Sequence, residues 1–156
     1  MKISEILEEK LVVTQLPGTA KDDIINAMVD IVGLSSKVIN KEKVRTAIFD
    51  REKIMSTGVG NGFAIPHGKT DAVSDIVAAF AVTAEPINYQ SLDEKPVRLV
   101  FLLVGRENLV GPHIKLLSRI SRLMNKEEFR NKLLGLQTSR DVIEAFKQEE
   151  ASYFEV

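Results

Sequence analysis

Two mostly apolar runs place the strongest constraint on how this chain can fold. Residues 76–82 read IVAAFAV and residues 97–104 read VRLVFLLV, and together they contain one charged side chain, Arg98. Neither run alternates apolar with polar residues, as a strand with one face in water would. Continuous apolar runs are typical of strands that are covered on both faces. We therefore expect two central strands in a sheet that other elements cover on both sides.

Patterns with helical spacing lie before and after these runs, at about residues 19–32, 40–53 and 112–124. A short helix is also possible over residues 3–10, a short strand over 63–65 and an edge strand over 86–89. Polar residues three positions apart predict helix N-termini. Three such pairs are Thr19 with Asp22, Asn125 with Glu128, and Thr138 with Asp141. In the helix over residues 112–124 we expect one apolar side made of Ile114, Leu117, Ile120 and Met124.

This order of elements predicts the α/β class. We expect a three-layer sandwich in which a small mixed β-sheet is flanked by helices on both faces. A chain of 156 residues can bury one sizeable core, so residues 1–156 are expected to form a single domain.

Composition excludes several classes of function. The chain has no Cys, which removes disulfides, Cys-ligated zinc and thiol catalysis. A formal net charge of -1 argues against general nucleic-acid binding or binding to anionic membranes. No apolar run approaches the roughly 20 residues of a membrane helix. Residues 1–10 carry three Glu and no apolar stretch, unlike a signal peptide, so a cytoplasmic location is expected.

A glycine-rich segment carries most of the candidate chemistry. Residues 56–68 read STGVGNGFAIPHG and contain four of the nine glycines. They match neither the dinucleotide fingerprint nor the phosphate-binding P-loop. Small residues still let backbone N–H groups approach an anion. His67 follows the expected short strand and is either a reactive imidazole or a surface residue on a tight turn.

His113 and Arg51 each allow two interpretations. His113 begins a helix, where a neutral imidazole or a bound anion is favoured, or it simply hydrogen-bonds a nearby carbonyl. Arg51 lies in the last turn of a helix, where it satisfies the helix end or reaches an anion near the glycine loop. The spacing of the two histidines does not fit a helical zinc motif, so no metal is expected.

Several strings in this sequence resemble one protein family. They are Arg51-Glu52, Ser56-Thr57-Gly58, Gly62-Phe63-Ala64-Ile65-Pro66-His67-Gly68, Pro86-Ile87, Pro96-Val97, His113-Ile114-x-x-Leu117-Ser118 and the segment from Phe129-Arg130 to Ile143. In this order they resemble the enzyme IIA domain of the fructose/mannitol/nitrogen-regulatory type, from the bacterial phosphoenolpyruvate-dependent phosphotransferase system. The resemblance covers nearly the whole chain and implies a mixed sheet sandwiched by helices.

The resemblance implies a phosphotransferase that carries a phosphoryl group on a histidine and needs no cofactor. His67 would accept the group from the phosphorylated histidine of the carrier protein HPr and pass it to a cysteine on an enzyme IIB protein, in support of sugar uptake. The alternative is a nitrogen-type regulatory module that signals to protein targets through its phosphorylation state. Features of the fructose and nitrogen-regulatory branches occur together.

The resemblance also implies roles for the residues around His67. His113 and Arg51 match accessory active-site positions, and we expect His113 to be partly exposed. Small residues of the glycine loop would bind phosphate, and apolar residues would form a rim that meets the protein partners. The phosphate-binding set is Ser56, Thr57, Gly60 and Asn61, and the rim is Phe63, Ile65, Leu109 and Val110. For Ile65, a core position is the alternative.

Overall fold

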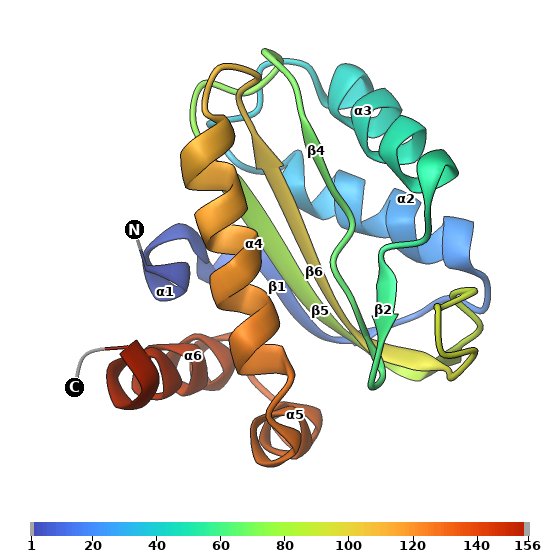
Figure 1. Ribbon diagram of the computed structural model, residues 1–156, viewed down its shortest axis with the longest axis vertical. Coiled ribbons are helices and arrows are strands. Elements are labelled where there is room, and N and C mark those ends of the chain that lie inside the picture. Colours follow the sequence, from blue (N-terminus) through green and yellow to red (C-terminus); the bar gives the residue numbers. More distant parts are fainter. Residues whose placement is uncertain (1, 155–156) are drawn as a thin grey trace.

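The computed structural model describes residues 2–154, and a mixed sheet of six strands lies at its centre (Figure 1). The strands are β1 (Val12–Leu16), β2 (Gly58–Gly60), β3 (Phe63–Ala64), β4 (His67–Lys69), β5 (Val77–Ile87) and β6 (Val97–Gly105). Their order is β1-β5-β6-β3-β2, and β4 also pairs with β6. The two long apolar strands, β5 and β6, are antiparallel neighbours at the centre, as their sequences predict.

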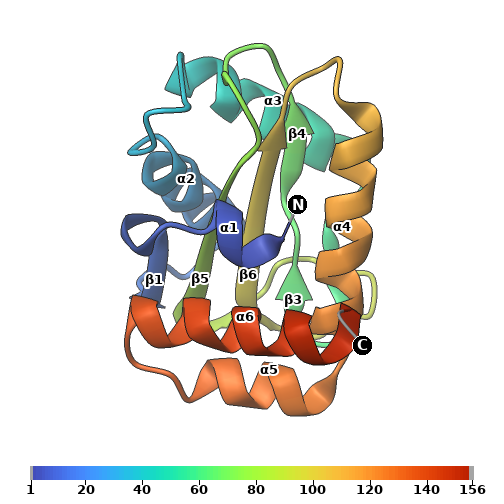
Figure 2. The ribbon, with the colours of Figure 1, turned by 90° about the vertical axis from the view of Figure 1, so that its left-hand side faces the viewer.

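Helices cover both faces of this sheet, so the predicted three-layer sandwich is confirmed (Figures 1 and 2). The helices are α1 (Ile3–Ile6), the 3-10 turn η1 (Glu9–Leu11), α2 (Lys21–Val32), α3 (Lys41–Ile54), α4 (Val110–Met124), α5 (Glu127–Leu134) and α6 (Ser139–Phe154). One face of the sheet packs against α1, α4, α5 and α6, and the other packs against α2 and α3.

Aromatic packing fixes α5 and α6 to the first face. The ring of Phe146 lies 5.3 Å from Phe80 on β5, 5.7 Å from Phe101 on β6 and 5.1 Å from Phe129 on α5, measured between centroids. All three pairs are edge-to-face, the geometry that aromatic quadrupoles favour. The central strands thus hold the helical layer that includes α4.

Parallel pairing with β6 fixes the segment on which the candidate chemistry lies. β3 pairs with the beginning of β6, and β4 pairs further along, with His67 opposite Leu103. Two residues, Ile65 and Pro66, separate the two short strands. The chain from 63 to 69 therefore follows the central strand, and its geometry is set by backbone hydrogen bonds to a buried neighbour.

Some boundaries differ from the sequence predictions. Residues 3–10 contain only four α-helical residues, and β1 follows them unpredicted. Residues 86–87 continue β5 instead of forming a separate strand, because Pro86 lies beyond the last pair with β1, Leu16 with Thr83. Pro86 can therefore stand in β5, because the pairing with β1 requires no backbone N–H from that residue.

The predicted helix caps gave mixed results. Thr138 accepts a hydrogen bond from the Asp141 N–H at 3.1 Å, as predicted. The predictions for Thr19 and Asn125 are wrong, because the N-cap residue is Ala20 for α2 and Lys126 for α5, and neither makes a side-chain cap. Asn40 is the cap of α3, where its Oδ1 accepts a hydrogen bond from the Lys43 N–H at 3.1 Å.

The buried side of α4 also differs from the predicted one. It consists of His113, Leu116, Ile120, Leu123 and Met124, and Ile114 is exposed. At the beginning of α4 the buried position is therefore one residue earlier than predicted. His113 points inward, and Ile114 lies on the face that carries the groove described below.

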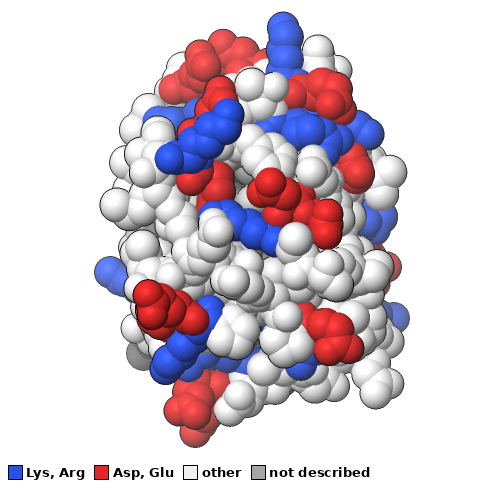
Figure 3. Space-filling model, turned by 90° about the vertical axis from the view of Figure 1, so that its right-hand side faces the viewer, with Lys and Arg blue, Asp and Glu red and all other residues white. Residues whose placement is uncertain are grey.

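Charged residues are mixed over the molecular surface that carries α3 and β2. Figure 3 shows Lys and Arg interspersed with Asp and Glu on this side. The balance of signs agrees with the small net charge of the whole chain.

Candidate active site

His67 lies at the beginning of β4, and its imidazole is held in one tautomer. Its Nδ1 is 2.8 Å from the backbone carbonyl oxygen of Ile65. A carbonyl can only accept a hydrogen bond, so Nδ1 carries the proton of the neutral ring. The Nε2 atom therefore keeps its lone pair, which makes it the nucleophilic nitrogen.

His113 lies in the first turn of α4 and faces the His67 ring. The two ring centroids are 5.7 Å apart. Neither ring nitrogen of His113 has a hydrogen-bond partner within the described structure, although the residue is only 3% exposed. The expectation that His113 is partly exposed is therefore wrong. Its inward turn buries the ring against β6.

Gly105 makes this burial possible. A Cβ atom added to Gly105 would lie 2.8 Å from Nδ1 of His113, which is closer than such atoms approach in proteins. The last residue of β6 therefore has no side chain at the point where the imidazole packs. The pairing of His113 with His67 depends on this glycine.

Both histidines are neutral near pH 7. Burial is the main cause that lowers the pKa of His67; the hydrogen bond to Ile65 opposes this shift, and the charge of Arg51 adds to it. Burial is also the main cause that lowers the pKa of His113, to about 4, and the positive charges of a protonated His67 and of Lys69 add to the shift. The site thus offers one neutral nucleophilic nitrogen beside a second neutral imidazole.

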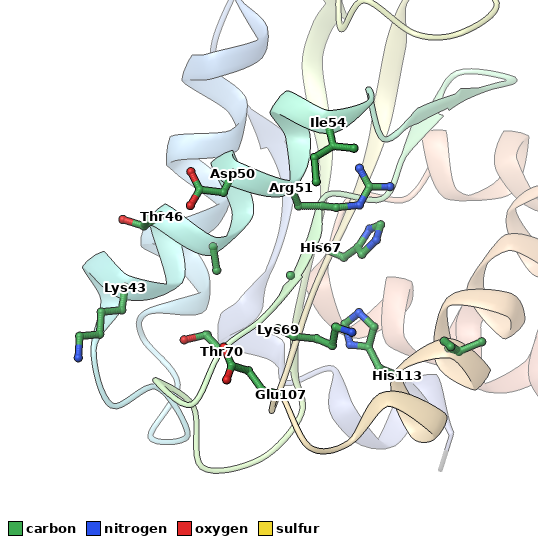
Figure 4. Close-up of a pocket in the computed structure, with 13 residues that line it drawn as sticks. Lys43, Thr46, Asp50, Arg51, Ile54, His67, Lys69, Thr70, Glu107 and His113 are labelled. Atoms are coloured by element: carbon green, nitrogen blue, oxygen red, sulfur yellow. The ribbon is translucent and has the colours of Figure 1, made fainter.

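The two histidines line a groove of about 750 Å³ between α3 and the beginning of α4 (Figure 4). Arg51 extends over His67, and Lys69 reaches toward His113. The remaining lining residues are Lys43, Thr46, Ala47, Asp50, Ile54, Gly68, Thr70, Glu107 and Ile114. Two cations beside two neutral imidazoles form an environment suited to a phosphate-sized anion.

Arg51 fits both interpretations of its sequence position. Its Nη1 donates to the carbonyl of Met55 at 3.0 Å, which satisfies the C-terminal end of α3. The same guanidinium lines the groove and acts on the charge state of His67. The helix-end contact therefore holds a cation beside the imidazole.

The predicted phosphate-binding residues lie outside this groove. Ser56 accepts a hydrogen bond from the Gly58 N–H at 3.1 Å, and Thr57 is buried against Glu52. The Asn61 N–H donates to the carboxylate of Asp93 at 3.0 Å, and Gly60 packs beside the same Asp93. None of the four lines the groove with His67. Contacts within the folded chain, both local and long-range, engage the residues that we expected to bind phosphate.

The four residues of the predicted apolar rim differ in their exposure. Phe63 and Ile65 are buried in the core, so their assignment to a rim is wrong. Phe63 lies on β3 and Ile65 directly after it, and both belong to the apolar cluster that packs against α4. Leu109 is half-buried, and Val110 is 44% exposed. Ile54 and Ile114, which sequence reasoning missed, are 79% and 59% exposed and line the groove from opposite sides.

Sequence reasoning also missed two charged residues, Lys69 and Glu52. Lys69 could have been found from its spacing, since residues two apart on a strand share a face and His67 begins β4. Glu52 follows Arg51 but is buried, and its partners come from other elements. No local pattern indicates those partners.

Residues 2–154 contain neither a metal-binding cluster nor a helix that could cross a bilayer. No group of three or more His, Asp or Glu side chains there is arranged to hold a metal ion. None of the helices in that range combines the length and apolar character that a bilayer span requires.

Comparison with known proteins identifies the family. Residues 5–149 match the family model described as "Phosphoenolpyruvate-dependent sugar phosphotransferase system, EIIA 2". The chain is 35% identical over 144 residues to a fructose-specific EIIA component of Haloferax volcanii, covering 90% of this chain and 94% of that protein. It is 34% identical over 148 residues to a fructose-specific EIIABC component of Bacillus subtilis, covering 95% of this chain but only 23% of that protein's length.

A solved structure agrees with this assignment. The nitrogen regulatory protein IIA-Ntr of Neisseria meningitidis is 30% identical and superposes with a TM-score of 0.87, over 92% of this chain and 98% of that one. The similar proteins thus include both sugar-specific and nitrogen-regulatory members. With its fold, its pair of histidines and a family match over residues 5–149, the chain belongs to the EIIA 2 family of the phosphoenolpyruvate-dependent sugar phosphotransferase system.

Proposed function

We propose that this chain is a phosphoryl carrier in which Nε2 of His67 accepts and returns the phosphoryl group. The observation that carries the proposal is the 2.8 Å contact between Nδ1 of His67 and the Ile65 carbonyl. It leaves Nε2 as the only nucleophilic nitrogen of the ring. The donor is the phosphorylated histidine of HPr, and the recipient is a cysteine on an enzyme IIB protein, all in the cytoplasm.

The transfer requires no cofactor and no change in proton number on His67. The Nε2 lone pair forms a bond to phosphorus while the P–N bond of the donor breaks, and that electron pair returns to the donor's ring. The Nδ1 proton stays on His67, held by the Ile65 carbonyl, and the phosphorylated ring carries a positive charge. In the return step, His67 leaves as a neutral imidazole, which keeps the phosphoryl group transferable.

The neighbours of His67 supply the electrostatic stabilisation that phosphoryl transfer needs. Arg51 and Lys69 are cations beside the ring, and their charges oppose the protonation of His67 while favouring a bound dianion. His113 has buried ring nitrogens without partners, so one N–H is available for a phosphoryl oxygen. Such positioned donors are worth about 10²-fold in rate.

The docking face for both partners surrounds the groove. We assign its apolar rim to Val110, Ile54 and Ile114, which are exposed, and to Leu109, which is half-buried. Donor and recipient must each bring a side chain to His67, so they use overlapping parts of one face. Transient contacts of this kind bury at most about 1,200 Å².

Incubation with phosphoenolpyruvate, enzyme I and HPr tests the proposal. We expect the intact mass to rise by one phosphoryl group that is lost on acid treatment. An unchanged mass would contradict the carrier function.

A regulatory role is the second candidate, favoured by the similarity to the nitrogen regulatory protein. It differs in one measurable step. A cysteine-containing IIB protein of the fructose type should discharge the phosphorylated chain if it is a transport carrier. Phosphorylation that no IIB protein discharges would favour the regulatory role.

A further inference from the structure

Glu52 is a buried carboxylate that the proposed transfer step does not use. Its Oε1 accepts a hydrogen bond from the Thr57 N–H at 2.9 Å and lies 2.8 Å from Nζ of Lys21. Its Oε2 accepts a hydrogen bond from the Thr57 hydroxyl at 2.6 Å. Buried charges persist where they are paired and hydrogen-bonded, and Glu52 meets both conditions.

The hydrogen bonds around Glu52 have a defined direction. The Thr57 hydroxyl donates its proton to Glu52, so the Tyr89 hydroxyl, 3.0 Å away, must donate to Thr57. Burial raises the pKa of Tyr89, which keeps this donor protonated. Lys21 adds its charge 4.8 Å from the centre of the Tyr89 ring. Donors from α2 and from the turn before β2 thus reach one carboxylate at the end of α3, and Tyr89, after β5, donates to the Thr57 hydroxyl.

This cluster controls the position of Arg51. The bond from the Thr57 N–H to Glu52 closes the turn formed by residues 52–57. Met55 lies inside that turn, and its carbonyl accepts the hydrogen bond from Arg51 at 3.0 Å. The carbonyl that holds the guanidinium over the groove is therefore fixed by Glu52.

The same cluster reaches His67 through the backbone. The Thr57 carbonyl accepts a hydrogen bond from the Ile65 N–H at 3.0 Å. The Ile65 carbonyl in turn holds Nδ1 of His67 at 2.8 Å. Thr57 is thus connected to both residues that meet the phosphoryl group. It reaches Arg51 through the turn that contains Met55, and it reaches His67 through Ile65.

We propose that Glu52 and Thr57 are positioning residues that hold the Arg51 guanidinium and the His67 imidazole in a fixed position relative to each other. This inference rests on the proposed function of His67. It gives Thr57 a role other than the phosphate binding expected from the sequence. Misplacement by about 1 Å can cost up to 10²-fold in rate, so the effect is measurable.

The direction in which the pKa of His67 shifts distinguishes a positioning role of Glu52 from a mere loss of packing. The charged groups that shift the pKa of His67 are Arg51 and Glu52 from α3 and Lys69 from its own strand. His113 from α4 faces the ring, and Lys43, Asp50 and Glu107 also line the groove. Of the charged groups that shift this pKa, Glu52 is the one that favours the protonated ring. Removing its charge lowers the pKa of His67. A site that merely loosens and admits water raises that pKa, because burial is what depresses it.

The experiment compares Glu52→Gln, Thr57→Val and Thr57→Ser with the intact chain. Glu150→Gln is the matched control, since Glu150 is also buried and accepts bonds from Ile3, Ser4 and Arg119, all outside the groove. For each variant, NMR gives the pKa and tautomer of His67 without any partner protein. Rapid-quench assays with phosphorylated HPr give the rate of phosphoryl transfer, and thermal melting gives stability.

We expect Glu52→Gln to lower the pKa of His67 and to slow transfer about tenfold or more. Thr57→Val should slow transfer to a similar extent and weaken the preference for the Nδ1–H tautomer, and Thr57→Ser should restore both. Glu150→Gln should lower the melting temperature while leaving His67 unchanged.

Three results would overturn the inference: an unchanged His67 in both Glu52→Gln and Thr57→Val, a rise in its pKa, or a failure of Thr57→Ser to restore the site. If Glu52→Gln does not fold, the two Thr57 variants decide. Absence of phosphorylation in the intact chain would instead contradict the proposed function, and the NMR titration would still test the positioning.

Discussion

The two imidazoles of the groove are neutral for a shared reason, burial, but they differ in their partners. His67 has one nitrogen bound by Ile65, and His113 has neither nitrogen bound. His67 is thereby suited to act as a nucleophile, and His113 is suited to donate a hydrogen bond to a group that enters the groove. Each role follows from hydrogen bonds that are present or absent in the folded chain.

The depressed pKa of His113 predicts acid sensitivity of the fold. The unfolded residue titrates near its ordinary value of about 6.5, and the folded one at about 4. Between these values the unfolded state binds more protons, so stability falls as the pH falls. Between pH 7 and pH 5 this residue alone should remove about 2 kcal/mol of unfolding free energy.

Urea titrations of the wild type and His113→Gln at both pH values measure this effect. The variant should lose less stability on acidification than the wild type. An equal loss in both proteins would show that His113 is not buried in its neutral form.

Gly105 provides a second prediction at this scale. A methyl group at residue 105 would lie against Nδ1 of His113, so Gly105→Ala should cost about 1–3 kcal/mol and displace the ring. The matched control is Gly111→Ala in the first turn of α4, where nothing lies within 4 Å of the added atom. It should be neutral or slightly stabilising. Denaturation curves and the NMR signals of His113 check both variants, and equal behaviour would refute the packing argument.

Individual site residues were predictable from the sequence only where a motif carried them. His67, His113 and Arg51 stand in strings that resemble a family, and the structure brings all three to one groove. The four loop residues predicted to bind phosphate lie outside the groove, because other contacts of the folded chain engage them. The carboxylate of Asp93, for example, accepts a hydrogen bond from the N–H of Asn61, which lies 32 positions away in the sequence. Hydrogen-bond competition of this kind is decided by tertiary structure and leaves no local signal.

At the scale of elements, long segments with strong patterns were predictable and short ones were not. β5 and β6 followed from uninterrupted apolar runs, and α3 and α4 from helical periodicity. β2 and β4 have three residues each and include glycines. They are strands because neighbouring strands supply their hydrogen bonds. Local propensity therefore could not reveal the strand on which His67 lies.

Helix capping offers a direct test at this scale. Asn40 caps α3 with its side chain, whereas Thr19 precedes α2 without capping it. Asn40→Ala should therefore cost about 1 kcal/mol and lower the melting temperature by about 2–4 °C. Thr19→Ala should change stability by less than about 0.5 kcal/mol. Paired melting curves decide the matter; a larger effect at Thr19 would contradict the assigned helix starts.

At the scale of the whole molecule, the sheet separates two apolar clusters and places the groove at one edge of both. His113 lies on α4, whose apolar residues belong to one cluster, and Arg51 lies on α3, whose apolar residues belong to the other. His67 lies on β4, which belongs to the sheet between the two clusters. The site is therefore assembled from two layers of the sandwich, and the sequence could predict the layers but not their meeting point.

The rim around the groove predicts where partners dock. Val110→Asp and Ile114→Asp place charge on exposed side chains and should leave the fold intact. Each should lower kcat/KM for phosphorylation by HPr on the order of tenfold, since an interface side chain contributes roughly 1–2 kcal/mol.

The control for the rim is Leu34→Asp, which alters a side chain that is 61% exposed and does not line the groove. It should leave the rate unchanged. Equal rates in all three variants would place the docking face elsewhere.

The central claim is that His67 carries the phosphoryl group, and one measurement tests it most directly. His67→Gln, His113→Gln and the wild type are incubated with phosphoenolpyruvate, enzyme I and HPr, and their intact masses are recorded before and after acid treatment. The wild type should gain one acid-labile phosphoryl group, His113→Gln should gain it more slowly, and His67→Gln should gain none. An acid-labile phosphoryl group on His67→Gln would contradict the account.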